Sequence, residues 1–151
     1  MPNWKRRRLE NYDYSQCGAY FVTICTIEKY NLFWKNDTFQ NMDDIQLTNL
    51  GEILNVSMEE LQRHYPFLQI DNYVIMPNHI HLIMVLTEQR MSLSTIINQW
   101  KGYVTRKYDT PVFQPSFHDH IIRDAAEYEK IWKYIEDNPR KWNEDKYYLA
   151  L

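Results

Sequence analysis

Glycine and cysteine are both scarce in this chain of 151 residues, with three glycines and two cysteines. Because the chain also has no low-complexity tract, a disordered tail of any length is not expected. Cys17 and Cys25 form no CxxC motif. We interpret them as reduced core thiols of a cytosolic protein.

The sequence also lacks a long apolar run and an excess of positive charge. No segment approaches the length of a transmembrane span, and no apolar run follows the basic start of the chain. We therefore expect a cytoplasmic protein with no membrane partner. The net charge of −3 argues against broad, non-specific coating of duplex DNA and leaves room for a local nucleic-acid site.

What the sequence does contain is enough apolar material for a full core. Apolar residues make up 44% of the chain and aromatic residues 15%, which fits one domain over residues 1–151. Apolar periodicity and turn signals predict strands at 18–27, 67–76, 79–86 and 117–123. They predict helices at 48–66, at 92–108 and within 125–142, where Asn138-Pro139 stops the last helix. We expect the helices to be capped by Thr48, by Ser92 or Ser94, and by Asp124.

The predicted order is β-α-β-β-α-β-α, which is the pattern of a ferredoxin-like split βαβ fold. It places the chain in the α+β class. We expect an antiparallel sheet with helices packed on one face and an additional C-terminal helix.

Two histidines, His79 and His81, occur in the strongly apolar strand at 79–86. Alternate strand residues point the same way, so both imidazoles share a face with Ile83 and Val85. Two desolvated imidazoles each need a polar partner, and a divalent cation would satisfy both. The alternative is that they are hydrogen-bonded core or edge residues.

A second pair, His118 and His120, flanks the charged Asp119 in the strand at 117–123. Local pattern alone does not choose between the two pairs. The charge of Asp119 indicates an edge strand, whose histidines are solvated or touch a ligand. We predict that this second pair does not ligate the metal, and we allow His120 a place near the bound ligand or the third helix.

The third predicted helix carries Tyr134 and Asn138 at positions i and i+4, on one helical face. A tyrosine can act as a covalent nucleophile, and an amide oxygen can ligate a hard cation. Equally, Tyr134 can be a core residue with its hydroxyl at the rim, while Asn138 merely ends the helix before Pro139.

The segments "VIMPNHIHLIMVL" and "VFQPSFHDHIIRDAAEYEKIWKYIEDNPRKW" closely resemble the REP-associated tyrosine transposases, relatives of the single-tyrosine HUH (IS200-like) transposases. The resemblance implies a ferredoxin-like fold, a metal site of His79, His81 and Asn138 for Mg²⁺ or Mn²⁺, and Tyr134 as the nucleophile. One departure is Phe113-Gln114-Pro115, where the family has tryptophan first.

The implied activity is that of an endonuclease and strand transferase for single-stranded, hairpin-bearing DNA, working through a 5′-phosphotyrosine. A homodimer is the assembly considered beside the monomer. Contacts to the nucleic acid are expected from Lys101, Tyr103, Arg106, Lys107, His120 and Arg123. Trp100 is assigned to the core. Two alternatives stand beside this reading: a hairpin-binding module that no longer cuts, and a metallohydrolase that uses water and forms no covalent adduct.

Overall fold

The computed structural model describes residues 18–35 and 45–144; Cys17 lies outside them. The elements are β1 (Gly18–Cys25), η1 (Ile27–Lys29), α1 (Asn49–His64), β2 (Leu68–Ile75), β3 (His79–Leu86), α2 (Leu93–Tyr108), β4 (His118–Ile122), α3 (Ala125–Asp137) and η3 (Asn138–Glu144). The predicted strands and helices are all present. As expected, α3 ends before Asn138 and Pro139, and the chain continues in the 3₁₀ turns of η3.

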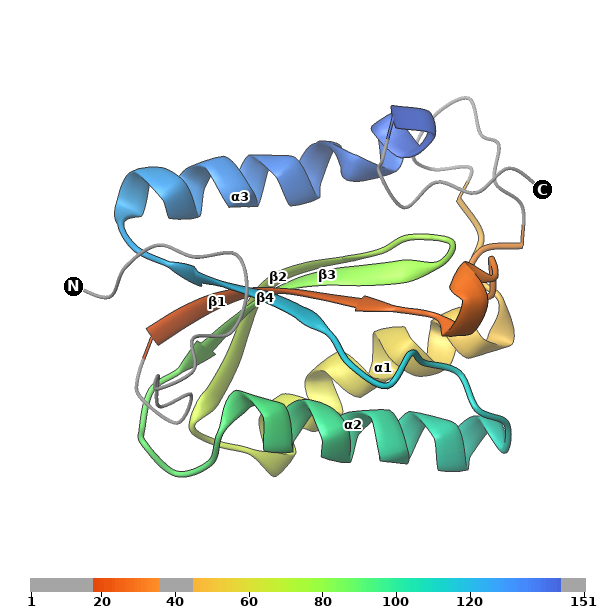
Figure 1. Cartoon of the computed structure of the whole chain (residues 1–151), viewed down its shortest axis with the longest axis horizontal. Coiled ribbons are helices and arrows are strands. Elements are labelled where there is room, and N and C mark those ends of the chain that lie inside the picture. The colour runs from red at the N-terminus through yellow and green to blue at the C-terminus, as the bar shows by residue number, and fades with distance from the viewer. Residues whose placement is uncertain (1–17, 36–44, 145–151) are drawn as a thin grey trace.

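The four strands form one antiparallel sheet in the order β2-β3-β1-β4. This order confirms the predicted ferredoxin-like topology. Helices α1 and α2 cover one face of the sheet, and α3 crosses the opposite face (Figure 1). The C-terminal helix is thus separated from the other two by the full thickness of the sheet.

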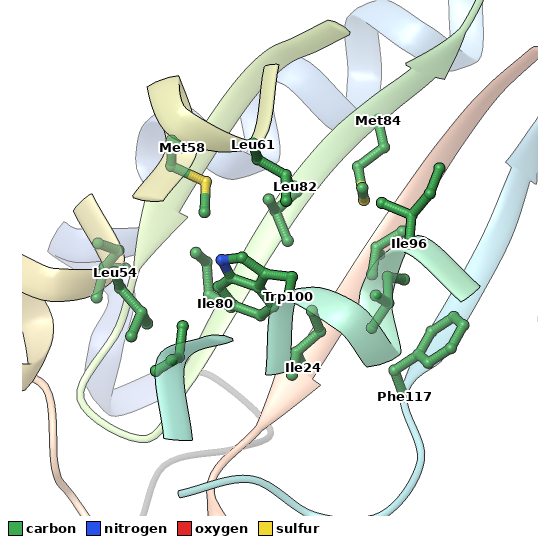
Figure 2. Close-up of a cluster of buried hydrophobic side chains, with 14 of the residues drawn as sticks. Ile24, Leu54, Met58, Leu61, Ile80, Leu82, Met84, Ile96, Trp100 and Phe117 are labelled. Atoms are coloured by element: carbon green, nitrogen blue, oxygen red, sulfur yellow. The ribbon is translucent and has the colours of Figure 1, made fainter. Parts of the chain in front are cut away.

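The main core lies between the sheet and the helices α1 and α2. Alternate residues of β3, namely Ile80, Leu82 and Met84, point into this layer and are almost completely buried. Trp100 of α2 packs among them, as predicted, and donates an Nε1 hydrogen bond of 2.8 Å to Ser57 (Figure 2). The periodicity of β3 therefore directs its apolar set toward two helices.

A smaller apolar cluster holds α3 against the other face. Ile131 and Ile135 of α3 pack on Ile83 of β3, with six partly buried neighbours around them. In the part of the chain that the structure describes, no helix has both the length and the apolar character that a membrane span needs.

Each helix begins at a side chain that caps its first turn. The oxygens of Thr48, Ser92 and Asp124 accept hydrogen bonds from backbone N–H groups three residues further on, at 3.1, 3.2 and 2.9 Å. These contacts satisfy donors that a helix terminus would otherwise leave unpaired. The choice between Ser92 and Ser94 is settled in favour of Ser92.

Strand β4 lies at the edge of the sheet, as predicted from its charged residue. On an edge strand a charged side chain usually points to solvent, but Asp119 does not. Asp119 is buried, whereas His118 is exposed. Asp119 alternates with His118 and His120, so it points to the side of the main core, and the two histidines point to the side of α3.

Gly51 marks a close approach between the first turn of α1 and residues 32–34. Thr48 donates its hydroxyl to the Leu32 carbonyl at 2.6 Å, and its N–H to the Phe33 carbonyl at 2.8 Å. A Cβ at Gly51 would lie 2.4 Å from the Phe33 carbonyl oxygen, which is backbone and cannot rotate away. A Cβ at Gly102 in α2 would meet only the end of the Arg106 side chain, at 3.2 Å.

We therefore predict opposite effects of two glycine-to-alanine changes. Gly51→Ala forces backbone apart and should lower the free energy of unfolding by about 1–3 kcal/mol. Gly102→Ala should leave it unchanged or raise it by up to about 1 kcal/mol, because alanine is the better helix former. Urea unfolding followed by circular dichroism measures both. Equal effects at the two positions would contradict the close approach at Gly51.

Candidate active site

The rings of His79 and His81 converge on the face of the sheet that α3 covers. Both side chains are almost completely buried. Their Nε2 atoms lie 3.1 Å apart, and the ring centroids are separated by 4.5 Å. The strand alternation thus brings the reactive edges of two imidazoles to one point, as the sequence predicted.

Each of these rings is fixed through its other nitrogen. The Nδ1 atom of His79 lies 2.7 Å from the Asn78 amide oxygen, and Nδ1 of His81 lies 2.7 Å from the Thr23 hydroxyl. Since an amide oxygen only accepts, Nδ1 of His79 carries the proton and its Nε2 presents a lone pair. A Thr23 hydroxyl that accepts from Nδ1 would give His81 the same tautomer.

This pair fits a divalent cation. Two ligands held at right angles at about 2.1 Å from one cation lie about 3.0 Å apart. Hydrogen bonds that orient the second nitrogen of a ligating histidine are usual in metal sites. The spacing also suits a direct N–H···N hydrogen bond between the two rings, which is the alternative already considered. The geometry is compatible with both states.

A third ligand would have to come from another type of residue. Within residues 18–35 and 45–144, no group of three or more His, Cys, Asp or Glu side chains could hold a metal ion. Asn138 is a buried amide, and its Nδ2 atom has no hydrogen-bond partner in the described part of the chain. An Asn amide can present either its oxygen or its nitrogen after a flip, so this side chain has capacity left for a ligand.

Asn138 is also bracketed by two residues that contact the histidines. Tyr134, four residues before it, places its ring 5.3 Å from that of His81, and Trp142, four residues after it, lies 6.2 Å from His79. The junction of α3 and η3 therefore runs along the histidine pair. In Figure 1, this junction lies at the same end of the sheet as the β2–β3 hairpin.

The predicted nucleophile Tyr134 lies beside the pair and remains accessible. Its side chain is 41% exposed, although it belongs to the helix that covers this face. The ring meets Phe21 edge-on at 6.0 Å, in addition to His81. The packing alternative, a core tyrosine, is less consistent with this exposure. The role of Tyr134 in chemistry remains a prediction.

The sequence did not predict four residues of the site. They are the two hydrogen-bond partners Thr23 and Asn78 and the two aromatic neighbours Phe21 and Trp142. A polar residue directly before a buried histidine was a signal available for Asn78. Thr23 had none, because its position opposite His81 follows from the pairing of β1 with β3.

The second histidine pair lies on the same face of the sheet, one strand beyond the site residues of β1: His118 is opposite Thr23 and His120 is opposite Phe21. His120 contacts Glu127, with 3.2 Å between Nε2 and Oε2, and Glu127 also accepts the Arg123 backbone N–H. Burial raises the pKa of Glu127, and the N–H and charge of Arg123 partly offset that rise. His120 is therefore near the third helix, as allowed. Contacts of His120 and Arg123 with DNA remain predictions.

The other expected DNA contacts all come from α2, on the opposite face of the sheet. Lys101 is buried, and its Nζ donates to the carbonyls of Gln114 and Ser116 at 2.9 Å each. Tyr103 donates to Glu60 at 2.6 Å, and this hydrogen bond is the main reason that the pKa of Tyr103 is raised.

Lys107 is exposed on the same helix and sits 5.8 Å from the Tyr103 ring. Arg106 and Tyr103 line a cavity of about 440 Å³ between α1 and α2. The sheet thus separates all four α2 residues from the histidine pair.

Comparisons with known proteins agree with this fold. No family model matches the chain. An uncharacterized protein of Haemophilus influenzae is 32% identical over 168 residues, covering 94% of this chain and 91% of that protein. The REP-associated tyrosine transposase of Escherichia coli is 30% identical over 129 residues, covering 85% of this chain and 70% of that protein.

A solved structure of a REP-associated tyrosine transposase bound to a REP hairpin has a TM-score of 0.64. The match has 24% sequence identity and covers 91% of this chain and 73% of that one. The fold is thus that of the tyrosine transposases. The chain belongs to the REP-associated tyrosine transposase family. These relatives are enzymes, and the prediction of an enzyme of this class is confirmed.

A second tyrosine of α3 offers a contrast with Tyr134. The Tyr128 hydroxyl donates to the Asp71 carboxylate at 2.5 Å. Burial and this hydrogen bond raise the pKa of Tyr128 to about 12. Its phenol is therefore held in the protonated form, which is a poor nucleophile.

We predict that ultraviolet titration of tyrosinate will detect the raised pKa of Tyr128. The difference between the curves of the native protein and of Tyr128→Phe should have its midpoint near pH 12. Because the pKa is raised in the folded state, the stability that the Asp71 contact contributes is present below about pH 10 and is lost as the pH rises toward 12. A midpoint near pH 10 would show that the contact does not persist in solution.

Proposed function

We propose that this transposase is a metal-dependent single-stranded DNA endonuclease and strand transferase that forms a phosphotyrosine at Tyr134. The observation that carries the proposal is the convergence of the His79 and His81 Nε2 atoms, 3.1 Å apart, with the Tyr134 ring 5.3 Å from His81. A nucleophile and a pair of cation ligands in contact are the parts that such a reaction needs.

In this proposal His79, His81 and Asn138 hold Mg²⁺ or Mn²⁺. When bound, the cation supplies positive charge that neutralises and orients the scissile phosphate. Thr23 and Asn78 keep the imidazoles in the tautomer that presents Nε2. Tyr134 lies in the last turn of α3 and Asn138 directly follows that helix, so the same end of α3 positions both the attacking oxygen and the third ligand.

Tyr134 performs the covalent step. Its phenolic oxygen loses a proton and attacks the phosphorus, a P–O bond to the protein forms, and the bond to the 3′ oxygen breaks. That oxygen takes up a proton and leaves as a 3′-hydroxyl. Because one phosphodiester replaces another, a second 3′-hydroxyl can reverse the attack and join a new strand without ATP.

The proposed substrate is hairpin-bearing single-stranded DNA. The family relationship and the REP hairpin bound by the structural relative support this choice. The net charge of −3 favours recognition through local contacts over bulk attraction to duplex DNA. A hairpin-binding module that no longer cuts is the alternative, and the presence of all four proposed site residues favours the enzyme.

We predict that Tyr134→Phe abolishes cleavage while fold and DNA binding survive, because only the hydroxyl is removed. The protein is incubated with labelled hairpin-bearing single strands and Mg²⁺, and a covalent adduct is sought on a denaturing gel. Tyr128→Phe is the matched control in the same helix and should still form the adduct. An adduct that persists in Tyr134→Phe would overturn the assignment, and cleavage without any adduct would favour the metallohydrolase.

We also predict that Mn²⁺ binding depends on the first histidine pair and not on the second. Thr23→Val removes a residue that orients His81 and should weaken Mn²⁺ binding about 10- to 100-fold. His79→Ala and His81→Ala each remove a ligand and should weaken Mn²⁺ binding more than Thr23→Val does. His118→Ala is the control and should bind like the native protein. Isothermal titration calorimetry separates these cases. Loss of binding in His118→Ala with retention in His79→Ala would show that the wrong pair had been chosen.

A further inference from the structure

The turn that follows β1 has an unusual backbone. Glu28 and Lys29 are consecutive non-glycine residues with positive φ angles of 54° and 55°. Residues other than glycine seldom adopt positive φ angles, because the Cβ then crowds the backbone, and two such residues in succession are rare. Such strain persists only where the surroundings impose it, and it is found preferentially at functional sites.

Hydrogen bonds on both sides of this turn hold it in place. On one side Thr26 donates its N–H to the Asn78 carbonyl at 3.0 Å. Its hydroxyl donates to the Tyr30 carbonyl at 2.7 Å, and the Asn78 carbonyl lies 3.2 Å from the same oxygen. On the other side the Ile27 N–H donates to the Val112 carbonyl at 2.9 Å. The turn is therefore a rigid projection and not a loosely tethered loop.

Asn78 joins this turn to the histidine pair. Its side-chain nitrogen donates to the Lys29 carbonyl at 3.3 Å, and its side-chain oxygen accepts from Nδ1 of His79 at 2.7 Å. Asn78 itself is fully buried. One amide therefore fixes the position of the strained turn relative to the ring proposed to ligate the cation. Figure 1 shows η1 and the β2–β3 hairpin at the same end of the sheet.

The residue that ends the turn presents an aromatic side chain to solvent. Tyr30 is 57% exposed, the highest value among the large exposed hydrophobic residues of the described chain, and Ile27 beside it is 37% exposed. In residues 18–35 and 45–144, no aromatic ring pairs with that of Tyr30. A solvent-facing ring on a turn that is hydrogen-bonded to a buried polar residue is not explained by the packing of the fold.

We propose that Tyr30 is a stacking platform for one unpaired nucleobase of the DNA strand, next to the phosphate bound at His79 and His81. This inference rests on the proposed function, since it assumes single-stranded DNA at that site. Every base has a π-face, so an aromatic ring can hold a strand without reading its sequence. A turn already fixed before binding loses little conformational freedom when the base arrives.

The experiment measures binding and stacking without cleavage, in a Tyr134→Phe background. Hairpin-bearing single strands carry the fluorescent base 2-aminopurine at one position at a time on either side of the cleaved phosphate. The Tyr134→Phe protein should bind these strands tightly and quench the 2-aminopurine fluorescence at one of these positions. Adding Tyr30→Ala to this protein should remove that quenching and weaken strand binding about tenfold, within the range for loss of one stacked base. Tyr30→Phe should retain both.

Tyr108→Ala is the matched control, because Tyr108 is an exposed tyrosine at the end of α2. It should change neither signal. When the strand has an abasic site at the quenched position, the protein with Tyr30 and the protein with Tyr30→Ala should bind it with the same affinity. If Tyr134→Phe binds the strands and Tyr30→Ala binds them equally well with unchanged quenching, the stacking role is wrong and the proposed function stands. If Tyr134→Phe binds no single-stranded DNA, both are overturned.

Discussion

The pleat of β3 is the constraint on which the rest of the structure depends. This strand is interior, paired with β1 on one side and β2 on the other. Its alternate residues Ile80, Leu82 and Met84 fill the core beneath α1 and α2, which leaves His79 and His81 on the opposite face. A slip of one residue would put two imidazoles into that apolar layer. The packing of the core therefore fixes where the site histidines point.

Helix α3 depends on this face in a different way. Its apolar contact is small, centred on Ile131, Ile135 and Ile83, whereas α1 and α2 share a much larger core. Polar contacts to both edge strands supplement it: Glu127 meets His120 of β4, and Tyr128 meets Asp71 of β2. The helix is thus held at both edges of the sheet, and the position of Tyr134 follows from these contacts together.

The sequence predicted what depends on local periodicity and could not predict what depends on pairing between distant strands. Helix caps and the shared face of His79 and His81 follow from spacing alone, and both were correct. Thr23 became a partner of His81 only through the register of β1 with β3, across 58 positions of chain. Lys101 was expected to contact nucleic acid, yet it is buried and donates to two carbonyls, because nothing local showed that Gln114 and Ser116 approach it.

The two faces of the sheet also divide the possible DNA contacts. The histidines lie on one face of the sheet, and α2, with Tyr103, Arg106 and Lys107, covers the other. The hydroxyl of Tyr103 donates a hydrogen bond to Glu60. The face that carries His79 and His81 also carries Tyr134 at the end of α3 and His118 and His120 of the edge strand β4. The turn that ends at Tyr30 is joined to this face through Asn78. A chain with a net charge of −3 cannot rely on bulk charge to orient DNA. Orientation at the site must then come from a few short-range contacts, which is the condition under which a rigid aromatic ring has the most influence.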